Sequence, residues 1–184
     1  MKHNRLFGCL LAIAMLMVAS VSAMAQEYVL KTVSFLKPGE KGVLAVSMTN
    51  PNPVKSFQGK IFLPEGLTFV ESETPDRFQI SKTERTGKYS LALAKGNDNN
   101  RVAAFLGFTL SDTFVPAGQG DILTFEVNVA EDFKATSEIQ IKESQISMGG
   151  GNIVKPEKVV TGKVANVADQ MFASTNEVKV AVGT

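Results

Sequence analysis

The sequence predicts an all-β sandwich, and three of its features point that way. Short runs rich in Val, Ile, Phe and Thr are separated by clusters of Gly, Pro, Asn and Asp, the pattern of strands joined by turns. Several runs alternate apolar with polar residues, as in Leu123-Thr124-Phe125-Glu126-Val127, so that one set of side chains would enter a core. No apolar stripe with the helical period of about 3.6 residues continues over a useful length.

The individual strands follow from the positions of these runs and of the turn residues between them. Turns are expected at Leu63-Pro64-Glu65-Gly66, from Gly96 to Asn100, and from Pro116 to Gly120, where Pro, Gly and Asn suit tight backbone bends. The apolar phase slips between 139 and 148, which indicates a bulge or break near Glu143. A short helix is a possibility only over 167–173. The expected strands are 28–35, 42–49, 55–63, 67–72, 77–81, 87–95, 101–109, 120–129, 137–148 and 158–164. The expected core includes Leu44, Val46, Ile61, Leu91, Leu106, Leu123, Phe125 and Val127.

Residues 1–25 are predicted to be a signal peptide that is cleaved after Ala25. Lys2 and Arg5 precede an apolar run from Leu6 to Val18, and Ala23-Met24-Ala25 is a typical cleavage site. An uncleaved membrane anchor is the alternative, but the apolar run is short for a membrane span. Cys9 lies at the start of this run rather than after it, which argues against a lipoprotein. The exported chain is therefore expected to be secreted, periplasmic or at the cell surface, with a domain over 26–164 and a C-terminal extension over 165–184.

The composition of the exported part favours a binding module over an enzyme. The only His is His3 and the only Cys is Cys9, and the chain has no Trp. After cleavage the common proton shuttle, the thiol nucleophile and the soft metal ligands are all missing, so no catalytic residue, metal site or cofactor is predicted. A glycosidase needs only two carboxylates, but here the acidic residues are scattered singly along the chain.

The charge balance also excludes some partners. Without Lys2 and Arg5, the chain has 17 basic residues (19 − 2) against 18 acidic ones. Such a near-neutral protein has no broad electrostatic attraction to nucleic acid or to anionic lipid. A nucleic-acid partner is therefore not expected, and neither is a membrane span in the mature chain.

Several motifs resemble those of cohesin domains, in the same order along the chain. They are Pro38 to Val46 with Asn50-Pro51-Asn52-Pro53-Val54, Phe57 to Val70, Gly118 to Val127, and the closing Gly162-Lys163-Val164. The resemblance covers about residues 28–164 and contains no catalytic signature. It implies a jelly-roll (immunoglobulin-like) β-sandwich of about nine strands. It also implies a protein partner of the dockerin type, since cohesins bind dockerins through one flat sheet face.

The resemblance places this face on the third, fifth, sixth and eighth strands, which correspond here to 55–63, 87–95, 101–109 and 120–129. Alternation then selects the outward side chains, with Phe62 and Phe105 as apolar anchors among small and polar residues. The alternative is that a loop or the N-terminal segment covers both phenylalanines. The predicted binding residues are Gln58, Lys60, Phe62, Ser90, Ala92, Ala103, Phe105, Thr124, Glu126 and Asn128, and Gly107 is expected to face outward beside them.

Two other binding hypotheses remain open from the sequence. A carbohydrate-binding module of a polysaccharide-utilisation system would share the sandwich fold, but Tyr28 and Tyr89 are the only tyrosines and Tyr89 is expected to point inward. Asn97, Asp98, Asn99 and Asn100 could offer oxygen ligands to calcium. One carboxylate is a poor charge complement for that ion, and a plain hairpin loop is the favoured interpretation.

Overall fold

The computed structural model describes residues 27–30, 34–96, 99–133, 137–156, 158–160 and 162–167, and these residues form a β-sandwich. The predicted signal peptide lies outside the described residues, as do Asn97, Asp98 and all but the first residue of the helix expected over 167–173. Within the described ranges, no helix has the length and apolar character that crossing a membrane requires.

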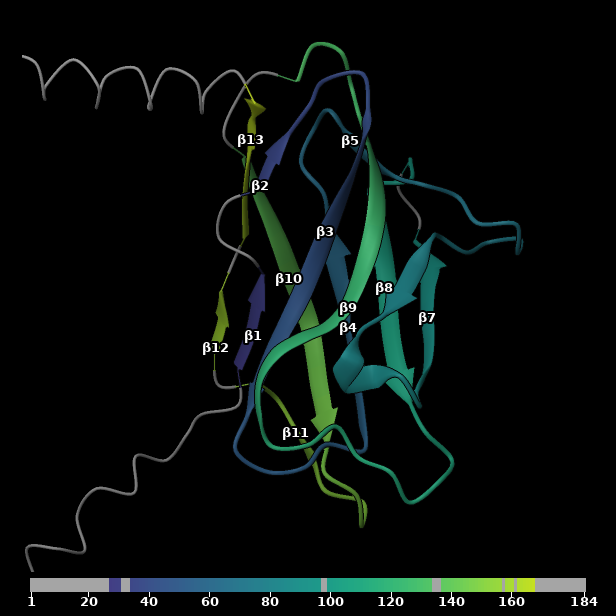
Figure 1. The fold of residues 1–184 in the computed structure, drawn as a ribbon, viewed down its shortest axis with the longest axis vertical. Helices are drawn as coiled ribbons and strands as arrows, with labels where there is room; N and C mark the ends of the chain where they lie inside the picture. The colour runs from purple at the N-terminus through teal and green to yellow at the C-terminus, as the bar shows by residue number, and fades with distance from the viewer. Residues whose placement is uncertain are drawn as a thin grey trace, which may run out of the picture.

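Two sheets pack against each other, as Figure 1 shows. The first has the strand order β12-β1-β3-β9-β5, with β6 also paired to β9, and the second has the order β2-β13-β10-β4-β8-β7, with β11 also paired to β10. The strands are β1 (Glu27–Leu30), β2 (Ser34–Leu36), β3 (Lys41–Asn50), β4 (Ser56–Phe62), β5 (Leu67–Phe69), β6 (Ile80–Lys82), β7 (Ser90–Lys95), β8 (Val102–Phe108), β9 (Gly118–Val129), β10 (Ser137–Ser147), β11 (Ile153–Val154), β12 (Lys158–Val160) and β13 (Gly162–Asn166). A 3₁₀ helix, η1 (Glu84–Thr86), precedes β7.

The core lies between the sheets and is built by the predicted alternation in most strands. Leu44 and Val46 of β3 and Leu123, Phe125 and Val127 of β9 are all buried, as expected for the inner face of an amphipathic strand. Ile61 is also buried as predicted, and Leu91 packs against the core while remaining partly accessible. Leu106 is the exception, with 37% of its surface exposed.

Two predicted strands each divide into a pair that belongs to different sheets. The segment expected at 28–35 forms β1, which pairs with β3, and β2, which pairs with β13. The segment expected at 158–164 likewise forms β12, which is parallel to β1, and β13, which is antiparallel to β10. Because the chain changes sheets twice along the same side of the sandwich, each sheet gains a parallel strand pair there. The prediction of one uninterrupted strand at 28–35 and another at 158–164 was therefore wrong.

The irregularity predicted near Glu143 is confirmed. The register between β10 and β4 shifts between Lys142 and Gln145, and Glu143 has a positive φ of 52°. A residue with this left-handed backbone breaks the alternation of a strand, because two residues on the bulged strand then oppose one on its partner. The apolar side chains on either side of the bulge, Ile141 and Ile146, can therefore both reach the core.

Arg85, in η1, links the segment just before β7 to one end of the first sheet through hydrogen bonds. Its guanidinium donates hydrogen bonds to the Met48 and Gly120 carbonyls at 2.8 and 3.0 Å. It also donates to Asn50 Oδ1 at 2.7 Å and to the Pro116 carbonyl at 2.9 Å. Partial burial lowers the pKa of Arg85 from its ordinary value, and these oxygens supply the acceptors that a buried guanidinium requires.

Candidate functional site

The outer face of the second sheet contains three of the four predicted strands side by side. β10, β4, β8 and β7 are consecutive neighbours in this sheet, so their outward side chains share one surface. On β4 the predicted residues Gln58, Lys60 and Phe62 do point outward, since their neighbours Phe57, Gly59 and Ile61 are buried. On β7, Ser90 and Ala92 point outward as predicted.

The fourth predicted strand lies in the other sheet, and this part of the prediction is wrong. Thr124, Glu126 and Asn128 belong to β9, which pairs with β3 along its length. They point outward, but on the opposite side of the sandwich from β4 and β8. The strand that completes the face is β10, which pairs with β4 on the side away from β8.

The alternation predicted for β8 is also wrong by one residue. Ala103, Phe105 and Gly107 face the core, and Phe105 is only 1% exposed. Leu106 instead points outward, although it was predicted to be in the core. The outward set on β8 is Val102, Ala104, Leu106 and Phe108.

Two glycine–aromatic pairs explain the phase of β8. Gly59 of β4 is directly opposite Phe105 of β8, and Phe57 of β4 is opposite Gly107 of β8. A Cβ on Gly59 would come within 2.7 Å of the Phe105 ring, and one on Gly107 within 2.1 Å of the Phe57 ring. Each ring therefore occupies the space above a residue without a side chain. The sequence of β8 is apolar at every position, so alternation alone could not reveal this phase.

The outer face of β7, β8 and β4 contains an open depression of about 400 Å³. Small side chains from Ala92, Ala94 and Ala104 line it together with the larger Leu106 and Phe108. An outward strip of alanines beside Leu106 leaves room for an apolar side chain from another molecule, because none of the residues that the structure describes fills the space. The depression therefore has the composition of the apolar centre of a protein interface.

Charged side chains border this apolar region. Arg77, at the β7 edge, and Lys60 and Glu143, on the β4 and β10 side, also line the depression. Lys60 Nζ lies 2.6 Å from Glu143 Oε2, and both side chains remain partly exposed. Lys142 lies over the Phe62 ring, with its Nζ 5.0 Å from the ring centroid. Phe62 is thus partly covered by a lysine rather than standing free as an apolar anchor.

Nothing on this face resembles a catalytic or metal site within the described residues. No group of three or more potential metal ligands is found among them. The acidic residues on the β10 part of the face are Glu138 and Glu143, which are separated along the strand by roughly 17 Å at about 3.3 Å per residue. A glycosidase pair must lie much closer, at about 5–9.5 Å.

The groups with shifted pKa values lie elsewhere. Hydrogen bonds from Lys95 and Asn100, together with the charge of Lys95, lower the pKa of Glu71. Lys95 Nζ and Asn100 Nδ2 each lie 3.0 Å from Glu71 Oε1. The Asn100 side chain therefore stabilises its own hairpin, in which Asn99 and Asn100 both have positive φ. Burial raises the pKa of Tyr89, which is enclosed as predicted and cannot stack on a ligand.

Comparison with known proteins finds relatives only at the level of structure. The sequence matches no protein-family model and no curated protein. Among solved structures, a non-cellulosomal cohesin from the hyperthermophilic archaeon Archaeoglobus fulgidus superposes with a TM-score of 0.58 at 13% identity, covering 81% of this chain and 97% of that one. A type II cohesin, A11 from Bacteroides cellulosolvens, has a TM-score of 0.60 at 14% identity, covering 76% of this chain and 99% of that one.

A third structure is a cohesin that was solved with its partner. The third cohesin of ScaC from Acetivibrio cellulolyticus, in complex with the ScaB dockerin, has a TM-score of 0.59 at 12% identity, covering 77% of this chain and 98% of that one. Identities this low establish a shared fold and leave activity open. The described chain has the cohesin-like β-sandwich fold.

Proposed function

We propose that this chain is an exported, non-catalytic binding module that holds a protein partner on the outer face of β10, β4, β8 and β7. The observation that carries the proposal is the apolar depression beside Leu106, bordered by Arg77, Lys60 and Glu143. An apolar centre with a charged rim is the usual anatomy of a protein interface. The sheet itself is a rigid platform, because β4 and β8 pair continuously from Ser56 to Phe62.

The binding energy is expected to concentrate in the apolar centre. Leu106 is already partly exposed, so a partner side chain seated beside it would remove apolar surface from water. The exposed Lys60–Glu143 pair is solvated and would contribute mainly to orientation and association rate. This revises the anchors from Phe62 and Phe105 to Leu106 and Phe108.

A dockerin is the first partner to test, because a cohesin of the same fold was solved with one. We propose titrating the mature chain, residues 26–184, with a panel of dockerin modules that bind type I and type II cohesins. Saturable binding by a dockerin, weakened at least tenfold by Leu106→Asp, is the expected result. A stable mature chain that binds none of the panel but binds a polysaccharide on a glycan array would overturn the proposal in favour of a carbohydrate-binding module.

Export is the part of the proposal that rests on the sequence alone. The signal peptide predicted for residues 1–25 places Gln26 at the start of the mature chain. Mass spectrometry of the protein recovered outside the cytoplasm should therefore find Gln26 as its first residue. An intact Met1 on that protein would contradict cleavage after Ala25.

A further inference from the structure

The loop after β8 exposes one leucine almost completely. Leu110 is 93% accessible, more than any other large apolar residue that the structure describes. Next to it, the hydroxyls of Thr109, Ser111 and Thr113 bond one another at 2.7–3.1 Å, and the Ser111 N–H donates to Thr109 Oγ1 at 3.2 Å. These hydrogen bonds order the loop, so little backbone freedom remains to be lost when Leu110 contacts another molecule.

Leu110 lies on the same outward side of the chain as the depression on β7, β8 and β4. The alternation of β8 continues past its last residue, since Thr109 is buried and Leu110 is exposed like Leu106. The loop continues beyond the end of β8 (Figure 1), and Phe108, which lines the depression, is two residues before Leu110. From Leu106 to Leu110 the distance along the chain is roughly 13 Å at about 3.3 Å per residue. One surface therefore contains both an apolar projection, Leu110, and an apolar depression.

The exposed charges beside the projection and beside the depression are of opposite sign. Asp112 is exposed two residues after Leu110. Arg77 is exposed where it lines the depression. Within the part of the chain that the structure describes, neither side chain forms an ion pair. Each is therefore available to a charge of the opposite sign on another molecule.

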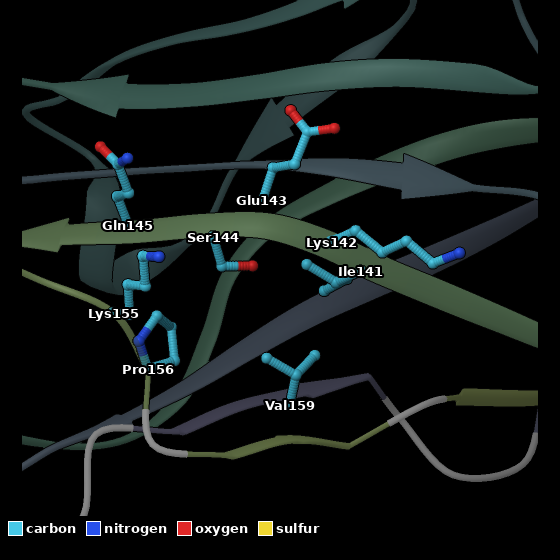
Figure 2. A pocket seen from close by; sticks show the side chains of 8 residues that line it. All are labelled: Ile141, Lys142, Glu143, Ser144, Gln145, Lys155, Pro156 and Val159. Atoms are coloured by element: carbon cyan, nitrogen blue, oxygen red, sulfur yellow. The ribbon is translucent and has the colours of Figure 1, made fainter.

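The other border of the depression contains a pair of charges that already neutralise each other. Figure 2, a close view of β10, shows Glu143 and Gln145 on the same side of that strand. Gln145 accepts a hydrogen bond from Gln58 of β4 at 3.3 Å, and Glu143 lies 2.6 Å from Lys60 of β4, so this side is the outer face of the sheet. Among the residues that line the depression, Arg77 is therefore the charge left to select an acidic group.

We propose that a second copy of this chain occupies the depression, with its Leu110 in the apolar centre and its Asp112 facing Arg77. The proposal rests on the binding face proposed above, and adds that the free protein covers this face with a second copy. A surface with a projection beside a depression is self-complementary about a two-fold axis, because each copy then supplies the same contact to the other. Each contact removes one fully exposed leucine from water. Dimerisation and partner binding at the depression are therefore mutually exclusive.

The size of the face sets the strength of this contact. Four neighbouring strands about 4.8 Å apart are roughly 14 Å across, and the seven residues of β4 or β8 extend roughly 23 Å. A flat area of roughly 330 Å² is well below the about 800 Å² that each partner buries in a stable complex of standard size. The dimer should therefore be weak and exchange readily, which leaves the face open to a partner that binds more tightly.

Sedimentation velocity of the mature chain, residues 26–184, from micromolar to millimolar concentration tests the proposal. The parent should show a reversible equilibrium between monomer and dimer. Leu110→Asp should weaken dimerisation at least tenfold, and so should Asp112→Arg, which places a positive charge against Arg77. Asp112→Arg combined with Arg77→Asp exchanges the two charges and should restore dimerisation, which a nonspecific loss of structure would not allow. Val43→Asp, on the opposite face, is the matched control and should leave dimerisation unchanged.

A parent that is monomeric at every concentration would overturn the proposal, as would a dimer that Leu110→Asp leaves intact or that the charge exchange does not restore. Species that grow beyond a dimer would overturn the two-fold contact. Titration with the dockerin panel separates this proposal from the proposed function. Leu110→Asp should bind a dockerin at least as tightly as the parent, because Leu110 lies outside the depression and its loss frees the face. The expected dimer without binding to any dockerin would support the self-association and contradict the proposed partner.

Discussion

The outer faces of the two sheets differ in what they leave exposed. On β3 and β9, the outward residues include the ion pair Lys41–Glu126, separated by 3.8 Å, and the buried small residues Ala45 and Ser47. Val43 stands alone there as a large exposed apolar residue. On β7, β8 and β4, alanines and the larger Leu106 and Phe108 surround a depression instead. A single exposed valine is normal for a protein surface, whereas a contiguous apolar hollow indicates a binding site.

The comparison therefore depends on which side chains of β8 point outward. If Phe105 rather than Leu106 faced solvent, the apolar hollow would have a different shape and the core would lose an aromatic ring. Substitutions on the inner side of β8, at the buried Tyr89 just before β7, and on the opposite face of the sandwich should therefore have different effects.

Phe105→Ala should have the largest effect, because it empties space in the core opposite Gly59. Removing a buried phenylalanine typically costs about 3–5 kcal/mol of unfolding free energy, and Phe105 is 1% exposed. Leu106→Ala, one residue along, should cost less than about 1 kcal/mol because its side chain already contacts solvent. Urea denaturation of both variants gives the comparison, and a larger loss in Leu106→Ala would restore the alternation first predicted from the sequence.

Tyr89→Phe should have an intermediate effect that depends on pH. The Tyr89 hydroxyl donates to the Val54 carbonyl at 2.6 Å and accepts from the Val115 N–H at 2.8 Å. Val54 and Val115 also bond each other, so the loss at neutral pH should be about 1 kcal/mol, typical of one net hydrogen bond.

The sign of the pH dependence follows from the raised pKa of Tyr89, whose ordinary value is 10.0. Above pH 10 the unfolded chain loses this proton while the folded chain keeps it, so the stability that the hydroxyl contributes is intact below pH 10 and lost as pH rises through the folded pKa. The difference in unfolding free energy between the parent and Tyr89→Phe should therefore shrink above pH 10. A difference that grows there would contradict the burial of this hydroxyl.

Glu126→Gln should have the smallest effect of the three. Glu126 forms an exposed pair with Lys41 at 3.8 Å, and such pairs contribute less than about 1 kcal/mol. Thermal unfolding should shift little, and partner binding should not change because Glu126 lies on the face away from the depression. Loss of binding in this variant would indicate that β9 does belong to the binding face.

The sequence was sufficient to predict the sandwich fold, the core alternation of β3 and β9, and the bulge at Glu143. Each of these leaves a local signal, either alternating polarity or a slip in its phase. β8 leaves none, because Val102 to Phe108 is apolar throughout. Its phase is fixed across the sheet, where the rings of Phe57 and Phe105 lie over Gly107 and Gly59.

Local sequence patterns also could not predict which of the two sheets each strand belongs to. Alternation identifies Thr124 and Glu126 as outward residues without revealing which sheet contains β9. The same is true of the segments 28–35 and 158–164, where the chain changes sheets between short strands. These features depend on long-range pairing, which a short window of sequence does not encode.

The same substitution on the two outer faces tests the central claim most directly. Leu106 and Val43 are exposed apolar residues on strands of opposite sheets, 37% and 64% accessible, so aspartate should be tolerated by the fold at both positions. Titration with a dockerin that binds the parent should show at least a tenfold weaker affinity for Leu106→Asp and an unchanged affinity for Val43→Asp. Unchanged affinity for Leu106→Asp with lost affinity for Val43→Asp would contradict the account and move the binding face to β3 and β9.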